Sequence, residues 1–493
     1  MKYSRPIKSP FLLLAFLLVS HTYADAGSSM TLTIHESITL AIAKNYFVKV
    51  SGFDPKIAAQ EVSKAKGSFD PIIGTEYSRR EFDVLNENGD IVTSTSDRET
   101  SSLFLRGVMP WGTRYLLEIN EDQLKTLDNT GQSHSSDADY SIEITQPLLR
   151  GLGLADRYAS TRLAMNRSEI QNWVFTDVIM RTVRNVVNNY AQLYFAKKNL
   201  AISRQSLELA QKLYDDNRKR VAVGRVAEYD IIRAEANYAR RQEDVINAKR
   251  RLHIQANRFK LLISDELESL INYDINIQDF VEPAEFEYSV LSDFKQALDL
   301  RPDYQQALLG INARRIEVKR DKRQALPTLD LVFRYDRFGT AQNNDSAFDS
   351  LRDHNAGSTY TGLSFSIPIT NQEGRARVRT AELALEKKEL DVARLKQAIL
   401  LDIDNAAAVV ASHWERIQAA QKALEITEKE LDATQKRFDA GRGNSFFVIN
   451  TQERLANARI RKILALSDFY RALADYYYET GQILRVYKVG IPI

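Results

Sequence analysis

The chain has 493 residues, 44% of them apolar and 27% charged, with a formal net charge of +2 and no cysteine. This composition excludes an intrinsically disordered chain and a helical membrane protein. The lack of cysteine excludes disulfides, thiolate catalysis, cysteine-ligated metals and lipoprotein-type lipidation.

The N-terminus is typical of a secretory signal peptide, assigned to residues 1–24. Three basic residues precede the apolar run Phe11–Val19, and small residues follow it, so that we expect cleavage after Ala24 or Ala26. A retained anchor is the alternative, but the run is far shorter than the roughly 20 residues of a spanning helix. Removal of this segment lowers the count of Lys and Arg from 67 to 64, against 65 Asp and Glu. The net charge therefore gives no indication of nucleic-acid binding.

Membrane crossing by this exported chain would require strands, because no later segment has 18 consecutive apolar residues. The pattern of residues 32–67, early in the chain, predicts a helical stretch with an interruption near Pro55. Strand signals follow, and polar stretches between them predict long loops. The expected strands lie in Ser68–Phe82, in Ser101–Met109 and Thr113–Asn120 around the turn Pro110–Gly112, and in Tyr140–Pro147; the expected loops are 83–99 and 122–138.

Residues Leu154 to Ile263 form an almost uninterrupted helical sequence, with no proline and with Gly224 as its single glycine. An apolar residue recurs every seven positions from Ile179 to Val221, which is typical of a coiled-coil seam. The charged residues around the seam are typical of a solvated face. The glycine lies in KRVAVGR, where we expect the helix to reverse, since a reversal needs positive φ or a close backbone approach.

The second half of the chain repeats this order. A helical stretch at 291–326, interrupted at Pro302, is followed by alternating strands in Ala325–Phe338 and Thr359–Pro368 and by a long helical run from Arg375 to Thr480, with a loop expected at 339–358. Six apolar seam residues, from Ile403 to Phe438, lie 217 residues after six apolar residues of the first seam, and KRFDAGR matches KRVAVGR at the same offset. This agreement favours an internal duplication over a chance phasing of heptads.

The sequence thus divides into segments that correspond between the two halves. The expected boundaries are 25–70 (short helices), 71–147 (strands and extracellular loops), 148–264 (long helix, turn and return helix), 265–290 (linker or equatorial segment), 291–326 (short helices), 327–368 (strands), 369–484 (long helix, turn and return helix) and 485–493 (tail).

The strands are too few for a barrel made by one copy. One chain supplies four strands, or six if the hairpin at 101–120 also spans, whereas single-chain barrels begin at about eight. A closed barrel therefore requires several copies, and three would give about twelve or eighteen strands. A soluble β-sandwich alternates in the same way, but helices of about 65 to 70 residues would span roughly 100 Å, far more than a globule.

The sequence resembles the bacterial outer-membrane efflux proteins of the TolC family. The resemblance covers essentially the whole mature chain, from LTIHESITLAIAKN through ALPTLDL, TQPLLRGLG and SIPITNQEG to VGRVAEYDIIRAEANYA and AGRGNSFFVINTQERLANA. It implies an α+β membrane protein, in which a trimeric outer-membrane β-barrel continues into a long periplasmic α-helical coiled-coil barrel, with two structural repeats per chain. It also implies a periplasmic adaptor, an inner-membrane pump or ABC exporter and outer-membrane lipid as partners.

In that family the helix reversals lie at the periplasmic tip and meet the adaptor. The resemblance therefore implies adaptor contact for Gly224, Arg225, Gly441 and Arg442, although an exposed arginine beside a turn is more often solvated.

The resemblance also implies a pore constriction just after the turns, where symmetric rings of acidic residues favour cations. Asp230 matches the first such position; an ordinary surface carboxylate is the alternative. Phe447 and Asn450 occupy positions where family members commonly carry Asp, so we expect a partly apolar constriction in the second turn.

No catalytic, metal or cofactor motif accompanies these features. The six histidines show no metal-ligand spacing, and phosphate-binding and nucleophile-elbow motifs are absent. We expect Arg150–Gly153 (RGLG) to form a strand-to-helix bend rather than a phosphate cradle, and Tyr476–Tyr478 to serve in helix packing. The sequence therefore predicts a passive exit duct for efflux or type I secretion, with no enzyme activity. The alternative is an exported coiled-coil structural or adaptor protein with a small β-domain.

Overall fold

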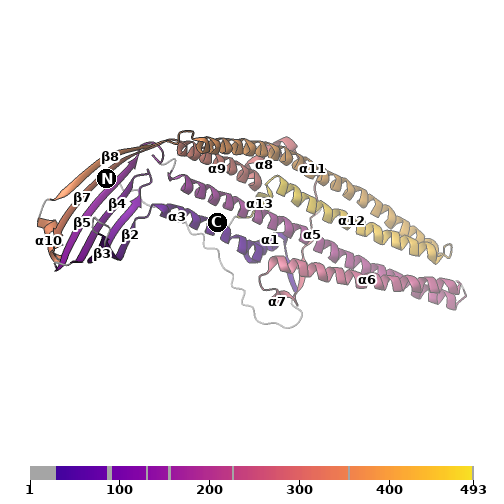
Figure 1. Ribbon diagram of the computed structural model, residues 1–493. Coiled ribbons are helices and arrows are strands. Elements are labelled where there is room, and N and C mark those ends of the chain that lie inside the picture. Colours follow the sequence, from indigo (N-terminus) through magenta and orange to yellow (C-terminus); the bar gives the residue numbers. More distant parts are fainter. Residues whose placement is uncertain are drawn as a thin grey trace, which may run out of the picture.

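The computed structural model describes residues 29–85, 91–128, 131–153, 157–224, 227–281, 283–342, 344–353 and 356–490. The expected signal peptide and Arg225 lie outside the described residues. The molecule is elongated, with a curved β-sheet at one end and long helices that run from the sheet to two helix reversals at the other end (Figure 1).

Six strands form one antiparallel sheet in the order β2-β3-β4-β5-β7-β8. Its strands are β2 (Ile72–Leu85), β3 (Ile91–Val108), β4 (Arg114–Asp128), β5 (Gly131–Pro147), β7 (Thr328–Ala341) and β8 (Gly357–Ser366). The two halves of the chain join where β5 pairs with β7, for example at Ile144 and Phe333. The hairpin β3–β4 belongs to this sheet, so that one chain contributes all six strands rather than four.

The long loops expected at 83–99 and 122–138 are wrong for most of their length. The β2–β3 register runs as far as Leu85 and Ile91, and the β4–β5 register as far as Asp128 and Gly131. Polar residues of the two expected loops pair across neighbouring strands, as Lys125 does with Glu99 at 3.7 Å. The loop expected at 339–358 is also wrong in part, because it contains α10 (Asn344–Asp353), which packs closely on Gly339.

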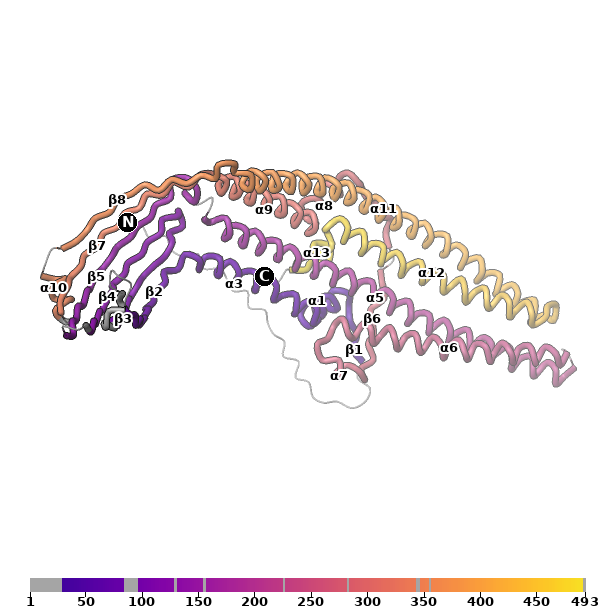
Figure 2. The backbone as a smooth tube through the Cα atoms, in the orientation of Figure 1, coloured from indigo at the N-terminus to yellow at the C-terminus, as the bar shows by residue number. Residues whose placement is uncertain are grey.

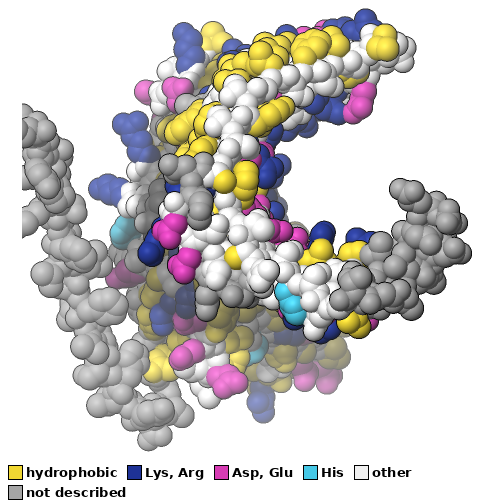
Figure 3. Space-filling view, turned by 60° about the vertical axis from the view of Figure 1, so that its left-hand side comes forward, with side chains coloured by type: hydrophobic (Ala, Val, Ile, Leu, Met, Phe, Trp, Pro, Cys, Tyr) yellow, Lys and Arg dark blue, Asp and Glu magenta, His cyan; other side chains and the backbone are white. Residues whose placement is uncertain are grey.

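One face of the sheet is apolar over the half of each strand nearest the helices. Residues that pair directly share a face, and the series Ile73, Leu105, Leu117, Ile142 and Tyr335 crosses five strands in this way. Many of these side chains are exposed, with Ile73 at 73%, Leu363 at 69% and Phe365 at 61%. Seen from the sheet end, hydrophobic side chains gather along the upper, curved part of the molecule, which encloses a hollow (Figure 3).

Two long helices in each half of the chain form the shaft. They are α5 (Ala159–Ala222) with α6 (Glu228–Ile263), and α11 (Gln372–Asp439) with α12 (Ser445–Glu479); α5 also packs on α12. Shorter helices lie beside them, namely α1 (Ile34–Lys44), α2 (Tyr46–Ser51) and α3 (Phe53–Lys66) against α5, α8 (Val290–Leu300) against α11, and α9 (Pro302–Gln324) between α5 and α11 (Figure 2). At about 1.5 Å per residue, α11 with its 68 residues is about 100 Å long.

The first short helical stretch is interrupted at Gly52, near Pro55 as expected, and also at Asn45. Pro55 lies in the first turn of α3, where the amide that proline lacks would have no helical acceptor. Pro302 is the first residue of α9 for the same reason.

The predicted heptad seam lies in the core of the shaft. Ile179, Val186 and Leu193 are at most 1% exposed, and Ile403 and Val410 are fully buried. Each such side chain stabilises the fold by about 1.5–3 kcal/mol relative to exposure. Toward the reversals Leu207, Tyr214 and Val221 are only half-buried, so the packing loosens as the shaft approaches its end.

The segment expected as a linker, 265–290, packs against the shaft. Its strand β6 (Asp274–Ile277) pairs in parallel with β1 (Ser29–Leu32), and α7 (Leu267–Leu270) precedes it. Phe280 packs against Tyr190 and stacks on Tyr470 at a centroid distance of 4.0 Å. The hydroxyl of Tyr190 donates to the Gln278 carbonyl at 2.8 Å, and burial raises the pKa of Tyr190 to about 12. The linker is therefore part of the core packing.

The RGLG bend after β5 packs against the β3–β4 turn. Gly151 and Gly153 have φ of +89° and +86°, and the Gly153 amide donates to the Trp111 carbonyl at 2.8 Å. A Cβ on Gly112 would lie 2.2 Å from the Gly151 carbonyl oxygen, so this approach requires glycine. No helix in the described ranges is long and apolar enough to cross a membrane. The chain ends beyond α13 (Ile483–Val486).

Candidate functional site

The two helix reversals have the same backbone geometry. Gly224 has φ of +72° and Gly441 has φ of +73°. Each glycine donates its amide hydrogen to a carbonyl three residues earlier, on Val221 at 2.9 Å and on Phe438 at 3.1 Å. No atom lies within 4 Å of a Cβ built on either glycine, so the requirement is for the left-handed backbone and not for space.

The two arginines predicted beside these glycines are placed differently. Arg225 lies outside the described residues. Arg442 is exposed, and its amide closes the second reversal by donating to the Arg437 carbonyl at 2.9 Å. The Arg442 guanidinium has no partner within the described part of the chain, so it is available to another molecule.

Arg220, which the sequence analysis missed, ties the two reversals together. Its guanidinium lies 4.3 Å from the centre of the Phe438 ring and donates to the Phe438 carbonyl at 3.0 Å and to the Asp439 carboxylate at 3.3 Å. It thus supplies a donor to the end of α11, where backbone carbonyls lack helical partners. The matched arginines of KRVAVGR and KRFDAGR are the signal that could have identified this residue.

Asp230 makes a second link between the reversals. The buried Ser445 hydroxyl at the start of α12 donates to the Asp230 carboxylate at 2.7 Å, and the Asn217 amide group donates to the Asp230 carbonyl at 3.4 Å. The carboxylate is half-buried. It is therefore a fixed joint between the first and second halves of the chain as well as an acidic group near the tip.

Phe447 and Asn450, the other predicted constriction residues, are exposed on α12. Phe447 packs edge-to-face on Phe446 at 5.6 Å. Arg233 lies 5.2 Å from the centre of the Phe446 ring and 4.8 Å from that of Tyr229. Exposed aromatic rings with a guanidinium between them form a surface suited to packing against another protein or a neighbouring copy.

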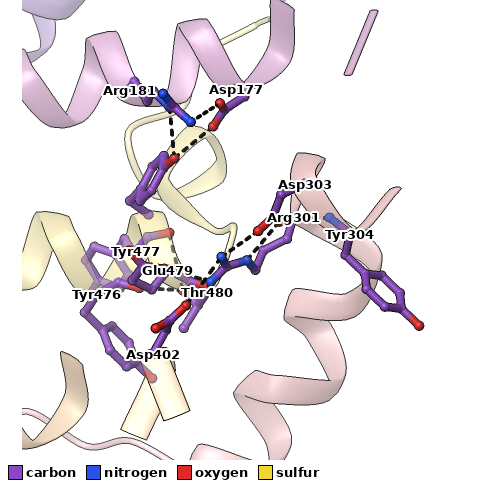
Figure 4. Close-up of polar contacts among 11 residues, drawn as sticks. Asp177, Arg181, Arg301, Asp303, Tyr304, Asp402, Tyr476, Tyr477, Glu479 and Thr480 are labelled. Carbon is purple, nitrogen blue, oxygen red and sulfur yellow. Dashed lines mark hydrogen bonds and ion pairs between the residues drawn. The ribbon is translucent and has the colours of Figure 1, made fainter. Parts of the chain in front are cut away.

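A third joint lies at the other end of α12, around Arg301 (Figure 4). Arg301 occupies the break between α8 and α9 and donates to both carboxylate oxygens of Asp303, at 3.0 and 2.7 Å. It also donates to the carboxylate and the carbonyl of Glu479, at 2.7 and 3.1 Å. Burial opposes ionisation of Arg301, but the surrounding carboxylates offset this and raise its pKa.

The tyrosines beside this joint fix α12 against its neighbours. The Tyr476 hydroxyl donates to Asp293 at 2.6 Å, and the Tyr478 hydroxyl donates to Asp177 at 2.9 Å. Arg184 lies 4.2 Å from the centre of the Tyr478 ring. The tyrosine triplet therefore serves in helix packing, as expected.

The arrangement holds no constellation for metal chemistry within the described ranges, where no three His, Asp or Glu side chains are grouped to bind an ion. Its chemistry is that of hydrogen-bonded joints and exposed turns at one end of a long shaft. Such features can dock a partner or open and close a passage.

One protein family matches most of the chain. The family model for the outer membrane efflux protein matches residues 117–264 and 294–481. A search of curated proteins found no match.

The chain is also similar to solved structures of outer-membrane proteins. The Campylobacter jejuni outer membrane channel CmeC matches with a TM-score of 0.68 at 16% identity, over 91% of this chain and 86% of that one. The outer membrane protein VceC of Vibrio cholerae matches with a TM-score of 0.66 at 15% identity, over 91% and 96%. The Neisseria gonorrhoeae outer membrane channel MtrE matches with a TM-score of 0.64 at 14% identity, over 92% and 89%. At these identities the similarity shows the fold.

Proposed function

The chain belongs to the outer membrane efflux protein family and acts in efflux at the outer membrane, and we propose that three copies assemble into a continuous exit duct. In this assembly the sheets close into an outer-membrane β-barrel and the shafts form a periplasmic tunnel of α-helices. Small molecules or proteins delivered by a partner would pass through it to the exterior. The family is a channel family and not an enzyme class.

The sheet supports closure with neighbouring copies. Within the described part of the chain, its first strand, β2, pairs only with β3, and its last strand, β8, pairs only with β7. An unpaired edge exposes backbone donors and acceptors, which lipid cannot satisfy. Pairing of β8 with β2 of the next copy would satisfy them, and three copies would give about eighteen strands.

The two faces of the sheet support a membrane position. The exposed apolar series that includes Ile73, Leu117 and Phe333 suits contact with lipid. The opposite face carries Arg114, Glu143 and Asp330, which suit a water-filled interior. This contrast between the faces, on a sheet joined to a shaft of about 100 Å, is the observation that carries the proposal.

We propose that the reversals lie at the periplasmic end and receive a periplasmic adaptor. Gly224, Arg225, Gly441 and Arg442 would form the contact, and an inner-membrane transporter or ABC exporter would supply the energy for transport. No nucleotide-binding motif occurs in the sequence, which agrees with an energy source outside this chain.

We propose further that Asp230, Phe447 and Asn450 narrow the passage at this end. The bond from Ser445 to Asp230 at 2.7 Å holds the two reversals of one copy together. Separation of the two reversals would widen the tunnel, so this bond would oppose opening.

Crosslinking tests the assembly. Because the sequence has no native cysteine, only the introduced cysteines can form disulfides. Single cysteines would be introduced along β2 and along β8, combined pairwise in the full-length protein, and oxidised in isolated outer membranes. We expect some pairs to give covalent dimers and trimers, whereas each single variant gives none above dimer. If no combination crosslinks and the protein fractionates with soluble periplasmic proteins, the proposed assembly is refuted.

A further inference from the structure

A cavity rich in arginine lies where the sheet meets the shaft. It has a volume of about 690 Å³ and receives side chains from both halves of the chain. Among the described residues, the arginines that line it are Arg114, Arg150, Arg157, Arg167, Arg320 and Arg377, and the one acidic lining residue is Asp330. We call this site the arginine cavity.

The arginine cavity opens on the polar face of the sheet. Arg114 precedes Tyr115, which pairs with the outward-facing Ile144, so that Arg114 lies on the opposite face. Asp330 lies between Leu329 and Leu331 of the apolar face and shares the side of Arg114, with which it forms an ion pair at 3.2 Å. The cavity is therefore on the side of the sheet that faces away from the exposed apolar residues.

The positive charge of this cavity is only partly neutralised. Arg114 pairs with Asp330, Arg320 bonds Asp321 at 2.8 Å, and Arg377 pairs with Glu373. The remaining three, Arg150, Arg157 and Arg167, are exposed, and no carboxylate of the described ranges lies within ion-pairing distance of them. Asp156, next to Arg157 in the sequence, lies outside these ranges.

The backbone adds to this positive field. Ser160 and Leu163, in the first turns of α5, line the cavity, and Arg377 stands in the second turn of α11. Helix N-termini carry partial positive charge, so the start of α5 favours an anion at this position.

We propose that the arginine cavity binds the oxyanion groups of solutes in transit, namely carboxylates and phosphates, and so favours anionic cargo. Guanidinium groups bind both through paired hydrogen bonds. This inference rests on the proposed duct, because the polar face becomes its interior. In a trimer three such cavities would form a positively charged zone below the barrel.

The test measures binding directly in the full-length protein in detergent. Pyrophosphate and citrate would serve as probes in calorimetric titrations of the wild type and of the triple variant R150Q/R157Q/R167Q. We expect the triple variant to bind both probes at least tenfold more weakly, and wild-type affinity to fall with added salt. Equal binding by the two proteins would overturn the proposal.

The variant K249Q/R250Q/R251Q is the matched control, because it removes the same charge from exposed positions of α6. These residues lie near the level of Asn189, which bonds Gln255, and so are about 40 Å along α5 from the cavity. We expect this control to retain wild-type binding; an equal loss in both variants would show a net-charge effect and reject the site.

Two further measurements separate the possible sources of failure. Wild-type binding in nanodiscs of neutral or of anionic lipid is expected to be the same, and loss of probe binding in anionic lipid would instead assign the cavity to lipid phosphate. In planar bilayers the triple variant is expected to conduct while losing pyrophosphate block by at least tenfold. Absence of conductance in both proteins would refute the duct, whereas the binding titration would still decide the cavity.

Discussion

Asp230 and Ser445 connect the two reversals of one chain, and the substitution of either partner tests what the carboxylate does. We expect Asp230→Ala and Ser445→Ala each to increase mean single-channel conductance in bilayers, because each breaks the 2.7 Å bond. Asp230→Asn retains an oxygen acceptor and should stay close to the wild type. If both Asp230 variants change cation preference while Ser445→Ala changes nothing, the carboxylate acts through its charge and not as a joint.

Arg301 provides a test of stability away from the passage. Its side chain is 10% exposed and bonds Asp303 and Glu479. Arg301→Ala leaves these carboxylates without their partner, and we expect the free energy of unfolding in detergent to fall by about 3–5 kcal/mol. Arg314→Ala on α9, the helix that begins directly after Arg301, removes an exposed pair with Glu317 and should cost at most about 1 kcal/mol. A similar loss of unfolding free energy in both variants would show that the buried bonds of Arg301 stabilise the fold no more than an exposed ion pair does.

The raised pKa of Glu479 predicts how the stability of the joint around Arg301 depends on pH. Burial raises the pKa of Glu479, and the nearby Arg301 opposes the shift only in part. A carboxyl group with a raised pKa in the folded state stabilises the fold fully below its unfolded pKa, near 4.3, and loses this contribution as pH rises through the folded value.

The variant Glu479→Gln mimics the protonated form and so removes this dependence. We expect its thermal midpoint to match the wild type below about pH 4 and to exceed it increasingly as pH rises above that value. A wild type that is the more stable protein at neutral pH would show that the attraction of Arg301 outweighs burial.

At the scale of elements, the reversals depend on the left-handed backbone of Gly224 and Gly441. Replacement by alanine meets no steric contact but is strained at φ near +72°. A cost of about 1–2 kcal/mol is expected, which should accelerate amide hydrogen exchange in the affected reversal by about 5–30 fold. Asparagine tolerates this conformation better, so Gly224→Asn should change exchange much less. Equal acceleration by alanine and asparagine would exclude the backbone explanation.

The sequence predicted those elements whose periodicity reflects burial. Leu329 to Tyr335 alternate and form part of β7, and the seam from Ile179 to Leu193 is buried. It failed where polar residues form strands, as in the paired Glu99 and Lys125, because such strands have no hydrophobic alternation. The bounds proposed for the repeats stay predictions.

Contacts between the two halves of the chain could not be read from local patterns. The duplication identified the glycines of the reversals, but the bond from Ser445 to Asp230 joins residues 215 positions apart. The pairing of β1 with β6 and the arginine cavity likewise depend on packing between distant segments. Sequence periodicity describes one element at a time and contains no information on such contacts.

At the scale of the whole molecule, one chain is incomplete as a membrane protein. As far as the structure describes the chain, its sheet has two open edges, its apolar face is exposed, and its hollow lies open on one side in Figure 3. Assembly of three copies would pair both edges of each sheet and close the hollow, and the apolar face would then contact lipid. We therefore expect the particle purified from the outer membrane to have three times the mass of the mature chain by native mass spectrometry, and a stable monomer would contradict the assembly.

This protein is expected to form a passage through the outer membrane. Purified full-length protein reconstituted in planar bilayers tests it most directly, with Asp230→Ala alongside as a variant expected to open further. We predict discrete conductance steps of uniform size for the wild type. Protein that inserts into the bilayer as trimers yet gives no steps, for either the wild type or the variant, would contradict the account.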